Sequence, residues 1–208
     1  MDTPWHRVAM ELLIAVVLWL YRGRSDYFVG GNMFLYYNEQ KALDQDYKGP
    51  DFFLVKGVDA KRKRYYWAVW EEGGRFPNVI IELLSPSTAK NDLTTKKDLY
   101  ERTFRTPEYF CCDPDGNFQG WRMVDGKYHK LQPNNKGWLW CEELDLWLGA
   151  WEGTYHNESG VFPRFFDAAG NLVPTTEEAE HDRADALAAR IRQLEAERNG
   201  GHPPAPPQ

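Results

Sequence analysis

Cysteine and histidine are scarce in this sequence, and neither forms a metal-binding pattern. The 208 residues include 3 cysteines and 5 histidines, with no CxxC pair and no clustered histidines. This argues against a structural zinc site and against a disulfide framework. The same cysteine usage favours a reducing, cytoplasmic location.

Long apolar runs are also missing. The most apolar stretch extends from Leu12 to Tyr21, between Glu11 and Arg22. As a helix it would rise about 15 Å, against the roughly 30 Å hydrocarbon core of a bilayer, so we expect no membrane span. No small-residue cleavage site follows it, which argues against a signal peptide. We expect a core helix over about 4–22.

Basic residues are outnumbered, with 25 Lys and Arg against 31 Asp and Glu, for a net charge of −6. Such a surface repels polyanions, so contact with nucleic acid requires a local basic patch. One patch is Lys61, Arg62, Lys63 and Arg64, and the aromatic residues 65–67 behind it could stack on unpaired bases. The alternative is a solubilising basic turn before a buried aromatic strand.

The first 174 residues alternate runs of strand-forming residues with turn residues, a pattern typical of an α/β protein. A glycine turn at 30–32 predicts a pair of strands around it. The run 78–84 is apolar on both faces, as in a strand at the middle of a covered sheet. A helix is expected from Ala89 to Arg105, ended by Pro107. Strands are predicted at 27–29, 33–37, 51–55, 65–70, 78–84, 109–112, 118–124 and 127–131, with further aromatic strand or short-helix material at 138–151.

The composition changes at residue 175. We predict one domain over 1–174, a charged C-terminal helix over 175–199, and a disordered Gly/Pro tail over 200–208. The helix carries Leu187, Ile191 and Leu194 at three- and four-residue spacing. That apolar stripe makes it a candidate surface for a homodimer.

Glu82 is the anomaly of the run 78–84, because the other residues from Val79 onward are Val, Ile and Leu. A buried carboxylate is costly unless it is paired, protonated or bound to a cation. Asp51 poses the same question before the apolar run 52–55. Two such carboxylates repel each other unless a divalent ion lies between them, and Mg²⁺ or Mn²⁺ prefers oxygen ligands. A plainer interpretation pairs Glu82 with a structural Lys or Arg and assigns Asp51 to a turn.

Lysines in the helix after Glu82 could supply the fixed cation that phosphate chemistry needs. Lys96 and Lys97 are the candidates, and Asp92 lies four residues before Lys96 on the same helix face. The alternative for Lys96 is a solvent-facing ion pair with Asp92, which would contribute little to stability.

Taken together, these residues resemble the bacterial Uma-type endonucleases, a restriction endonuclease family of the PD-(D/E)XK nuclease superfamily. The resemblance covers roughly residues 6 to 180. It rests on Pro50-Asp51 before an apolar strand, the run from Val79 to Thr88, then Asp92, Lys96 and Tyr100, and the stretch 107–110 with Asp113-Pro114 behind it.

The resemblance implies a restriction-endonuclease-like core, a mixed β-sheet flanked by helices, followed by a charged helix. It further implies a metal-dependent phosphodiesterase site in which Asp51 and Glu82 hold Mg²⁺ or Mn²⁺. The superfamily has a lysine two residues after the second acid, where this sequence has Leu84. Lys96 therefore matches the catalytic lysine, with Lys97 as the fallback.

Two functional hypotheses follow. The first is a Mg²⁺-dependent DNA endonuclease that contacts DNA through the 61–64 patch and Lys97. The second is a non-catalytic nuclease-fold scaffold that assembles through its C-terminal helix, motivated by the acidic charge and the displaced lysine. Glu11 could add an outer carboxylate to the site, although a helix-surface acid is the simpler interpretation.

Overall fold

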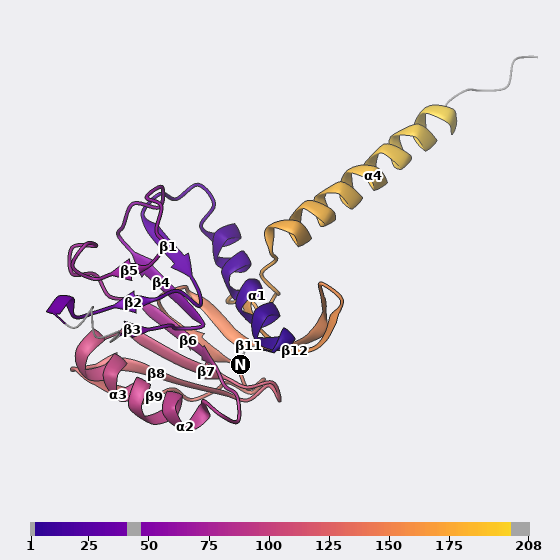
Figure 1. Cartoon of the computed structure of the whole chain (residues 1–208). Coiled ribbons are helices and arrows are strands. Elements are labelled where there is room, and N and C mark those ends of the chain that lie inside the picture. The colour runs from indigo at the N-terminus through magenta and orange to yellow at the C-terminus, as the bar shows by residue number, and fades with distance from the viewer. Residues whose placement is uncertain (1–2, 41–46, 201–208) are drawn as a thin grey trace, which may run out of the picture. The chain divides into compact units, whose positions relative to one another are not determined.

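A six-stranded mixed sheet forms the centre of the first part of the chain (Figure 1). The computed structural model describes residues 3–40 and 47–200, and it divides the chain into two compact units, Met1–Val173 and Pro174–Gln208. The strand order is β1-β4-β6-β7-β8-β9, in which only β6 and β7 are parallel neighbours. The strands are β1 (Tyr27–Gly30), β4 (Phe52–Lys56), β6 (Val79–Leu83), β7 (Glu108–Cys112), β8 (Phe118–Val124) and β9 (Lys127–Lys130).

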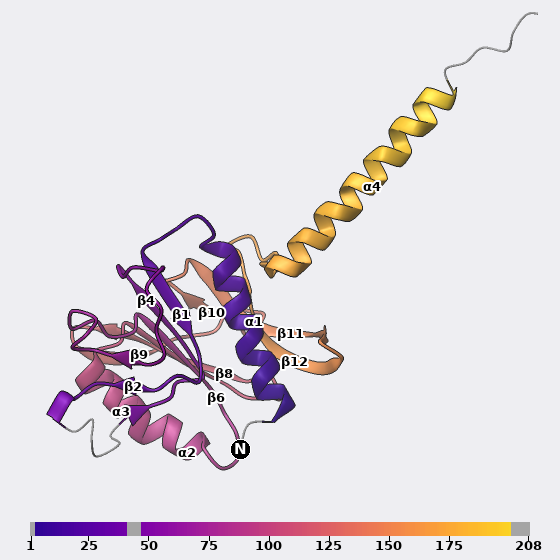
Figure 2. The same cartoon turned by 45° about the horizontal axis from the view of Figure 1, so that its top comes forward.

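One face of this sheet is covered by α1 (Pro4–Leu20) and by a second sheet of β10 (Leu139–Cys141), β11 (Leu146–Tyr155) and β12 (Glu158–Phe166). Figure 2 shows α1 lying against β12, in agreement with their contacts. Thr3 caps α1, since its side chain accepts a hydrogen bond from the His6 N–H, and Pro4 begins the first turn. The predicted core helix is confirmed.

The opposite face is covered by the helical segment 89–104 and by a small sheet of β2 (Leu35–Tyr36), β3 (Tyr47–Lys48) and β5 (Trp67–Ala68). Side chains alternate between the two faces of a strand. Ile81 and Leu83 therefore pack in the core on the α1 side, whereas Ile80 packs in the core with Tyr100. The mixed sheet flanked by helices is confirmed.

The helical segment after β6 mixes α- and π-helical turns. It consists of Ala89–Asn91, the π-turn Asp92–Lys96, then Lys97–Leu99, and a second π-turn over Tyr100–Phe104. Arg105 ends it in the left-handed conformation, with φ of 52°. The predicted helix 89–105 is therefore confirmed to within one residue.

Two sequence predictions about strands need correction. The runs around the 30–32 turn do not pair with each other, because β1 joins the central sheet and β2 joins the small one. The strand β12 was not predicted, since Gly160 and Pro163 interrupt its pattern. β12 lies at the edge of its sheet, where a proline costs no ladder hydrogen bond.

The second unit contains α4 (Thr176–Gly200). A capping box begins it: the Thr175 N–H donates to Glu178 Oε2 at 2.7 Å, and the Glu178 N–H donates to Thr175 Oγ1 at 3.2 Å. The predicted tail lies outside the described residues, apart from Gly200. Within residues 3–40 and 47–200, no helix has the length and apolar character needed to cross a membrane.

Candidate active site

Glu82 lies at the centre of the sheet with its carboxylate fully buried. β6 is flanked by β4 and β7, and all five of its residues are buried. The Tyr100 hydroxyl donates a 2.8 Å hydrogen bond to Glu82 Oε1, and the Lys96 ammonium lies 3.0 Å from Oε2. The buried acid is therefore paired with the lysine that the sequence predicted beside it.

Lys96 is held between two buried acids. Its ammonium also lies 2.9 Å from Asp92 Oδ1, and the Asp92 side chain is only 2% exposed, so this is not a solvent-facing pair. In an α-helix a residue four positions on lies about 40° round the axis. The π-turns are wider and reduce this rotation between residues four apart. Asp92, Lys96 and Tyr100 therefore all lie on the face of the segment that is directed at Glu82.

Asp51 reaches the same strand from its neighbour. It directly precedes β4, and its Oδ2 accepts a 2.7 Å hydrogen bond from the backbone N–H of Leu83. Burial raises the pKa of Asp51, while the Leu83 N–H, Lys96 and a hydrogen bond with Glu82 act to lower it. The two predicted acids are therefore neighbours, not groups on opposite faces of the sheet.

The glycine turn at 30–32 supports Asp51 from behind. A Cβ on Gly31 would overlap the Asp51 carbonyl oxygen and would lie 2.8 Å from the Met10 side chain. The adjacent Asn32 N–H donates a 2.9 Å hydrogen bond to the carbonyl of Pro50. This turn therefore packs against the Pro50-Asp51 pair, which requires glycine at position 31.

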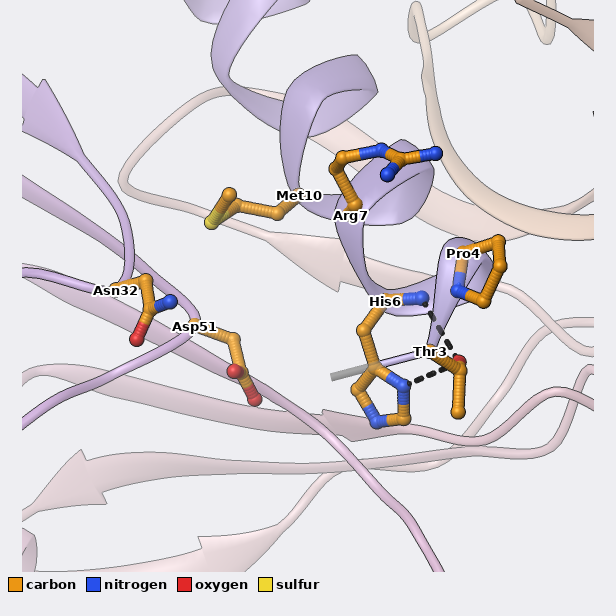
Figure 3. Close-up of a pocket in the computed structure, with 7 residues that line it drawn as sticks. All are labelled: Thr3, Pro4, His6, Arg7, Met10, Asn32 and Asp51. Atoms are coloured by element: carbon orange, nitrogen blue, oxygen red, sulfur yellow. Dashed lines mark hydrogen bonds between the residues drawn. The ribbon is translucent and has the colours of Figure 1, made fainter. Parts of the chain in front are cut away.

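A cavity of about 460 Å³ opens beside Asp51 (Figure 3). Figure 3 shows Asp51 on one side of it and the first turns of α1 on the other. The lining combines a few polar groups with apolar ones, as substrate sites commonly do. Its residues are Thr3, Pro4, His6, Arg7, Met10, Asn32 and Asp51.

His6 ties α1 to the strand that carries Glu82, a role that sequence reasoning missed. Its Nε2 lies 3.1 Å from the Leu83 carbonyl oxygen and its Nδ1 lies 2.8 Å from Thr3 Oγ1. A carbonyl oxygen can only accept, so Nε2 is the donor in the bond to Leu83. Leu83 is thus held at its N–H by Asp51 and at its carbonyl by His6. No local motif marks this contact, since the partners are 77 residues apart.

The cluster carries an excess of acidic groups. Asp51, Glu82 and Asp92 surround a single lysine. Burial raises the pKa of Glu82 to about 8, helped by the charges of Asp51 and Asp92 and opposed by Lys96 and the Tyr100 hydrogen bond. Burial alone would lower the pKa of Lys96, but its acidic neighbours outweigh that effect and the pKa is raised. A protonated lysine and a partly neutralised acid result.

The donor set suits a hard divalent cation that keeps several other oxygen ligands. Asp51 and Glu82 offer carboxylate oxygens, and the surplus of acids would be offset by a divalent charge. Among the described residues no group of three or more His, Cys, Asp and Glu could hold a metal ion. A divalent ion at this pair would need water or phosphate oxygens as its remaining ligands.

Glu108 is a second buried acid that sequence reasoning also missed, and its surroundings differ. Arg122 lies 2.8 Å from its carboxylate, and the backbone N–H groups of Glu142 and Glu143 donate to it at 3.0 and 2.9 Å. The Cys141 thiol donates to the same group. Glu108 is therefore saturated by protein donors, which indicates a structural role joining β7 to the second sheet.

The predicted nucleic-acid contacts divide into paired and exposed side chains. The Arg64 side chain is only 2% exposed, and its guanidinium lies 2.9 Å from the Glu72 carboxylate. Arg62 lies 3.3 Å from the same acid. Lys61 and Lys63 are exposed, and the Lys97 ammonium lies 5.2 Å from the Trp121 ring. Arg64 is thus committed to the fold in this structure.

A comparison with protein-family models matches residues 1–151 to the Uma2 family, described as "Putative restriction endonuclease". The chain belongs to the Uma2 family. The resemblance found in the sequence is therefore confirmed, and it assigns the chain to a family of nucleases. None of the curated proteins compared with it matches the sequence.

A solved structure similar to this Uma2 chain is that of a "putative nuclease belonging to DUF820" from Anabaena variabilis. The two are 13% identical with a TM-score of 0.49, and the match covers 69% of this chain and 75% of the other. The family match includes Asp51, Glu82, Lys96 and His6, whereas α4 lies outside it.

Glu11 lines a separate hollow with Tyr155 and does not join the acid cluster.

Proposed function

We propose that this Uma2 protein is a divalent-metal-dependent DNA endonuclease that hydrolyses phosphodiester bonds. The observation that carries the proposal is the buried ion pair between Lys96 and Glu82, 3.0 Å apart, with Asp51 next to it on the edge of a cavity. An ion pair with a purely structural role would not account for the second acid, Asp51, or for the cavity beside Asp51.

Asp51 and Glu82 would hold Mg²⁺ or Mn²⁺. Such an ion, when bound, lowers the pKa of a water ligand and neutralises charge on a phosphate oxygen. Lys96 has three ammonium protons, of which two are directed at Glu82 and Asp92. The third remains to orient the attacking water and to stabilise negative charge that develops on the phosphate. Tyr100 holds the Glu82 carboxylate in place through its hydrogen bond.

The test is nicking of supercoiled plasmid, and cleavage of single-stranded DNA, with Mg²⁺, with Mn²⁺ and with a chelator. We expect cleavage by the wild-type protein only with metal, and a loss of at least about a hundredfold in Glu82→Gln, Asp51→Asn and Lys96→Met. Lys90→Met is the matched control, because Lys90 is exposed on the same helical segment. Circular dichroism checks that each variant is folded. Equal rates for Glu82→Gln and wild type would refute the proposal.

Metal uptake gives a readout that is independent of cleavage. Isothermal calorimetry with Mn²⁺ should detect binding to the wild-type protein and much weaker binding to folded Glu82→Gln and Asp51→Asn. Wild-type protein that neither takes up metal nor cuts any DNA would favour the alternative, a non-catalytic scaffold with a nuclease fold.

We further propose that α4 pairs with α4 of a second copy. Leu187, Ile191 and Leu194 are 56%, 56% and 47% exposed, at d, a and d positions of a heptad pattern. In a parallel pair, Arg190 at position g would face Glu195 at position e of the other copy, so the flanking charges are complementary. This surface serves both the endonuclease and the scaffold hypotheses.

Light scattering tests the pairing. The wild-type chain should have the mass of a dimer. Leu187→Glu/Ile191→Glu should have the mass of a monomer and should keep the thermal unfolding transition of the first unit. Ala189→Glu, at position f on the outer face, is the matched control. A wild-type mass of one chain would overturn this part of the proposal.

A further inference from the structure

We infer that Arg7, in the first turn of α1, binds a phosphate of the DNA at the Asp51 cavity, in place of the basic loop that the sequence suggests. The inference rests on the proposed endonuclease function and extends it by naming the residue that would hold the substrate backbone next to the two acids.

The direction of β4 separates the basic loop from the acids. Asp51 precedes β4 at one end, and residues 61–64 follow the other end at Lys56. A strand over Phe52–Lys56 extends about 16 Å. Two of the four cations in that loop are also paired: Arg62 lies within ion-pair distance of Glu71 and Glu72, and Arg64 binds Glu72. The loop therefore places little available charge next to Asp51.

Arg7 supplies a cation at the correct end. Among the described residues that line the Asp51 cavity it is the one with a permanent positive charge. The Arg7 side chain is exposed, and among the described residues no acid forms an ion pair with it. Figure 3 shows Arg7 above His6 on the α1 side of the cavity, with its guanidinium extended away from Asp51.

The position of Arg7 is fixed relative to the acids through its neighbour in the chain. His6 binds the Leu83 carbonyl at 3.1 Å, and the Leu83 N–H binds Asp51 at 2.7 Å. Thr3 holds the His6 ring from the other side at 2.8 Å. The first turn of α1 is therefore tied to the end of β6, one residue beyond Glu82.

A cation at the rim of the cavity would favour the approach of a phosphate. Without a bound metal ion, three acids and one lysine form the cluster, and Asp51 lines the cavity, so a phosphate there meets negative charge. A guanidinium binds phosphate oxygens through two parallel hydrogen bonds, which also orients the phosphate. Arg7 at the rim would therefore both attract the backbone and set its register against Asp51 and Glu82.

Binding to a labelled DNA duplex, measured by fluorescence anisotropy in a chelator to prevent cleavage, tests this inference. We expect Arg7→Gln to weaken binding about tenfold and to reduce the slope of log K against log salt concentration by about one. Arg7→Lys should keep the slope but recover only part of the affinity, because lysine lacks the bidentate geometry.

Arg22→Gln is the matched control, since Arg22 carries the same charge just beyond the other end of α1, about 22 Å from Arg7. Lys61→Gln/Lys63→Gln measures the contribution of the basic loop. If Arg7→Gln binds DNA like Arg22→Gln with an unchanged salt slope, the inference is wrong, whether or not the wild-type protein cuts. If the wild-type protein does not cut while Arg7→Gln still loses affinity, the endonuclease function fails and the phosphate contact stands.

Discussion

Removal of the Lys96 charge should destabilise this protein strongly, in a way that depends on pH. Lys96 is the cation that contacts both Glu82 and Asp92, at 3.0 and 2.9 Å, and both acids are buried. In Lys96→Met they would remain without that charge. Breaking a buried ion pair by removing one partner costs about 3–5 kcal/mol, because the remaining charge stays desolvated. For a domain of this size the loss corresponds to a fall in Tm of about 6–20 °C.

The pH dependence identifies the cause of this loss. Lys96 lowers the pKa of Glu82, which burial raises to about 8, so the pKa in Lys96→Met should be higher still. Glu82 then takes up a proton at acidic pH and no longer carries a buried charge. The difference in unfolding free energy between wild type and variant should therefore be smallest near pH 5.5 and should grow as the pH rises past 8.

Thermal and urea denaturation in a chelator, at pH 5.5 and pH 9, measures both effects. Lys90→Met is the control, and it should lie within about 0.5 kcal/mol of wild type because Lys90 is exposed. The double variant Lys96→Met/Glu82→Gln should recover part of the lost unfolding free energy at pH 9, because the unpaired buried charge of Glu82 is removed. A Lys96→Met variant as stable as wild type at pH 9, or equally destabilised at both pH values, would refute this reasoning.

Three further predictions concern the same cluster. Gly31→Ala should leave the sheet intact but displace the Asp51 backbone, so we expect at least a tenfold loss of metal affinity by calorimetry, and unchanged affinity would contradict the close packing. Tyr100→Phe removes the 2.8 Å hydrogen bond to Glu82 and should cost about 1–3 kcal/mol in a urea titration, whereas Tyr65→Phe, at an exposed position, should cost nothing measurable. Because the pKa of Glu82 is raised from 4.5 to about 8, the metal-free wild-type protein should lose stability as the pH rises through that interval, and Glu82→Gln should lose less; identical profiles would exclude Glu82 as the group responsible.

Much of the acid pair could be anticipated from local sequence. Glu82 stands in an apolar run that fits only a buried strand, and the acid itself is what makes that strand unusual. The Lys96 spacing from Asp92 predicts a helix-face contact, and the two side chains do meet. Local sequence could not establish that this contact is buried, because burial depends on the face of the sheet against which the helical segment packs.

The sequence pattern did not predict contacts between segments that are far apart in the chain. His6 meets Leu83 across 77 residues, and neither residue carries a signal that names the other. The basic run 61–64 suggests a surface patch, yet the Arg64 side chain pairs with Glu72 and is almost fully covered. The sequence shows that these charges are present. Whether they are free to bind a ligand depends on which acids the fold brings within about 3 Å of them.

By itself, the sequence determined the central apolar strands, the amphipathic and charged helices, the acid embedded in β6 and the family to which the chain belongs, because these depend on residue type and short spacing. Only the tertiary structure decided that Asp51 and Glu82 are neighbours, that α1 closes over their end of the sheet, and that β4 carries the basic loop away from them. Those outcomes depend on strand order and direction, which hydrophobic alternation does not encode: each strand has the same pattern whichever neighbour it pairs with.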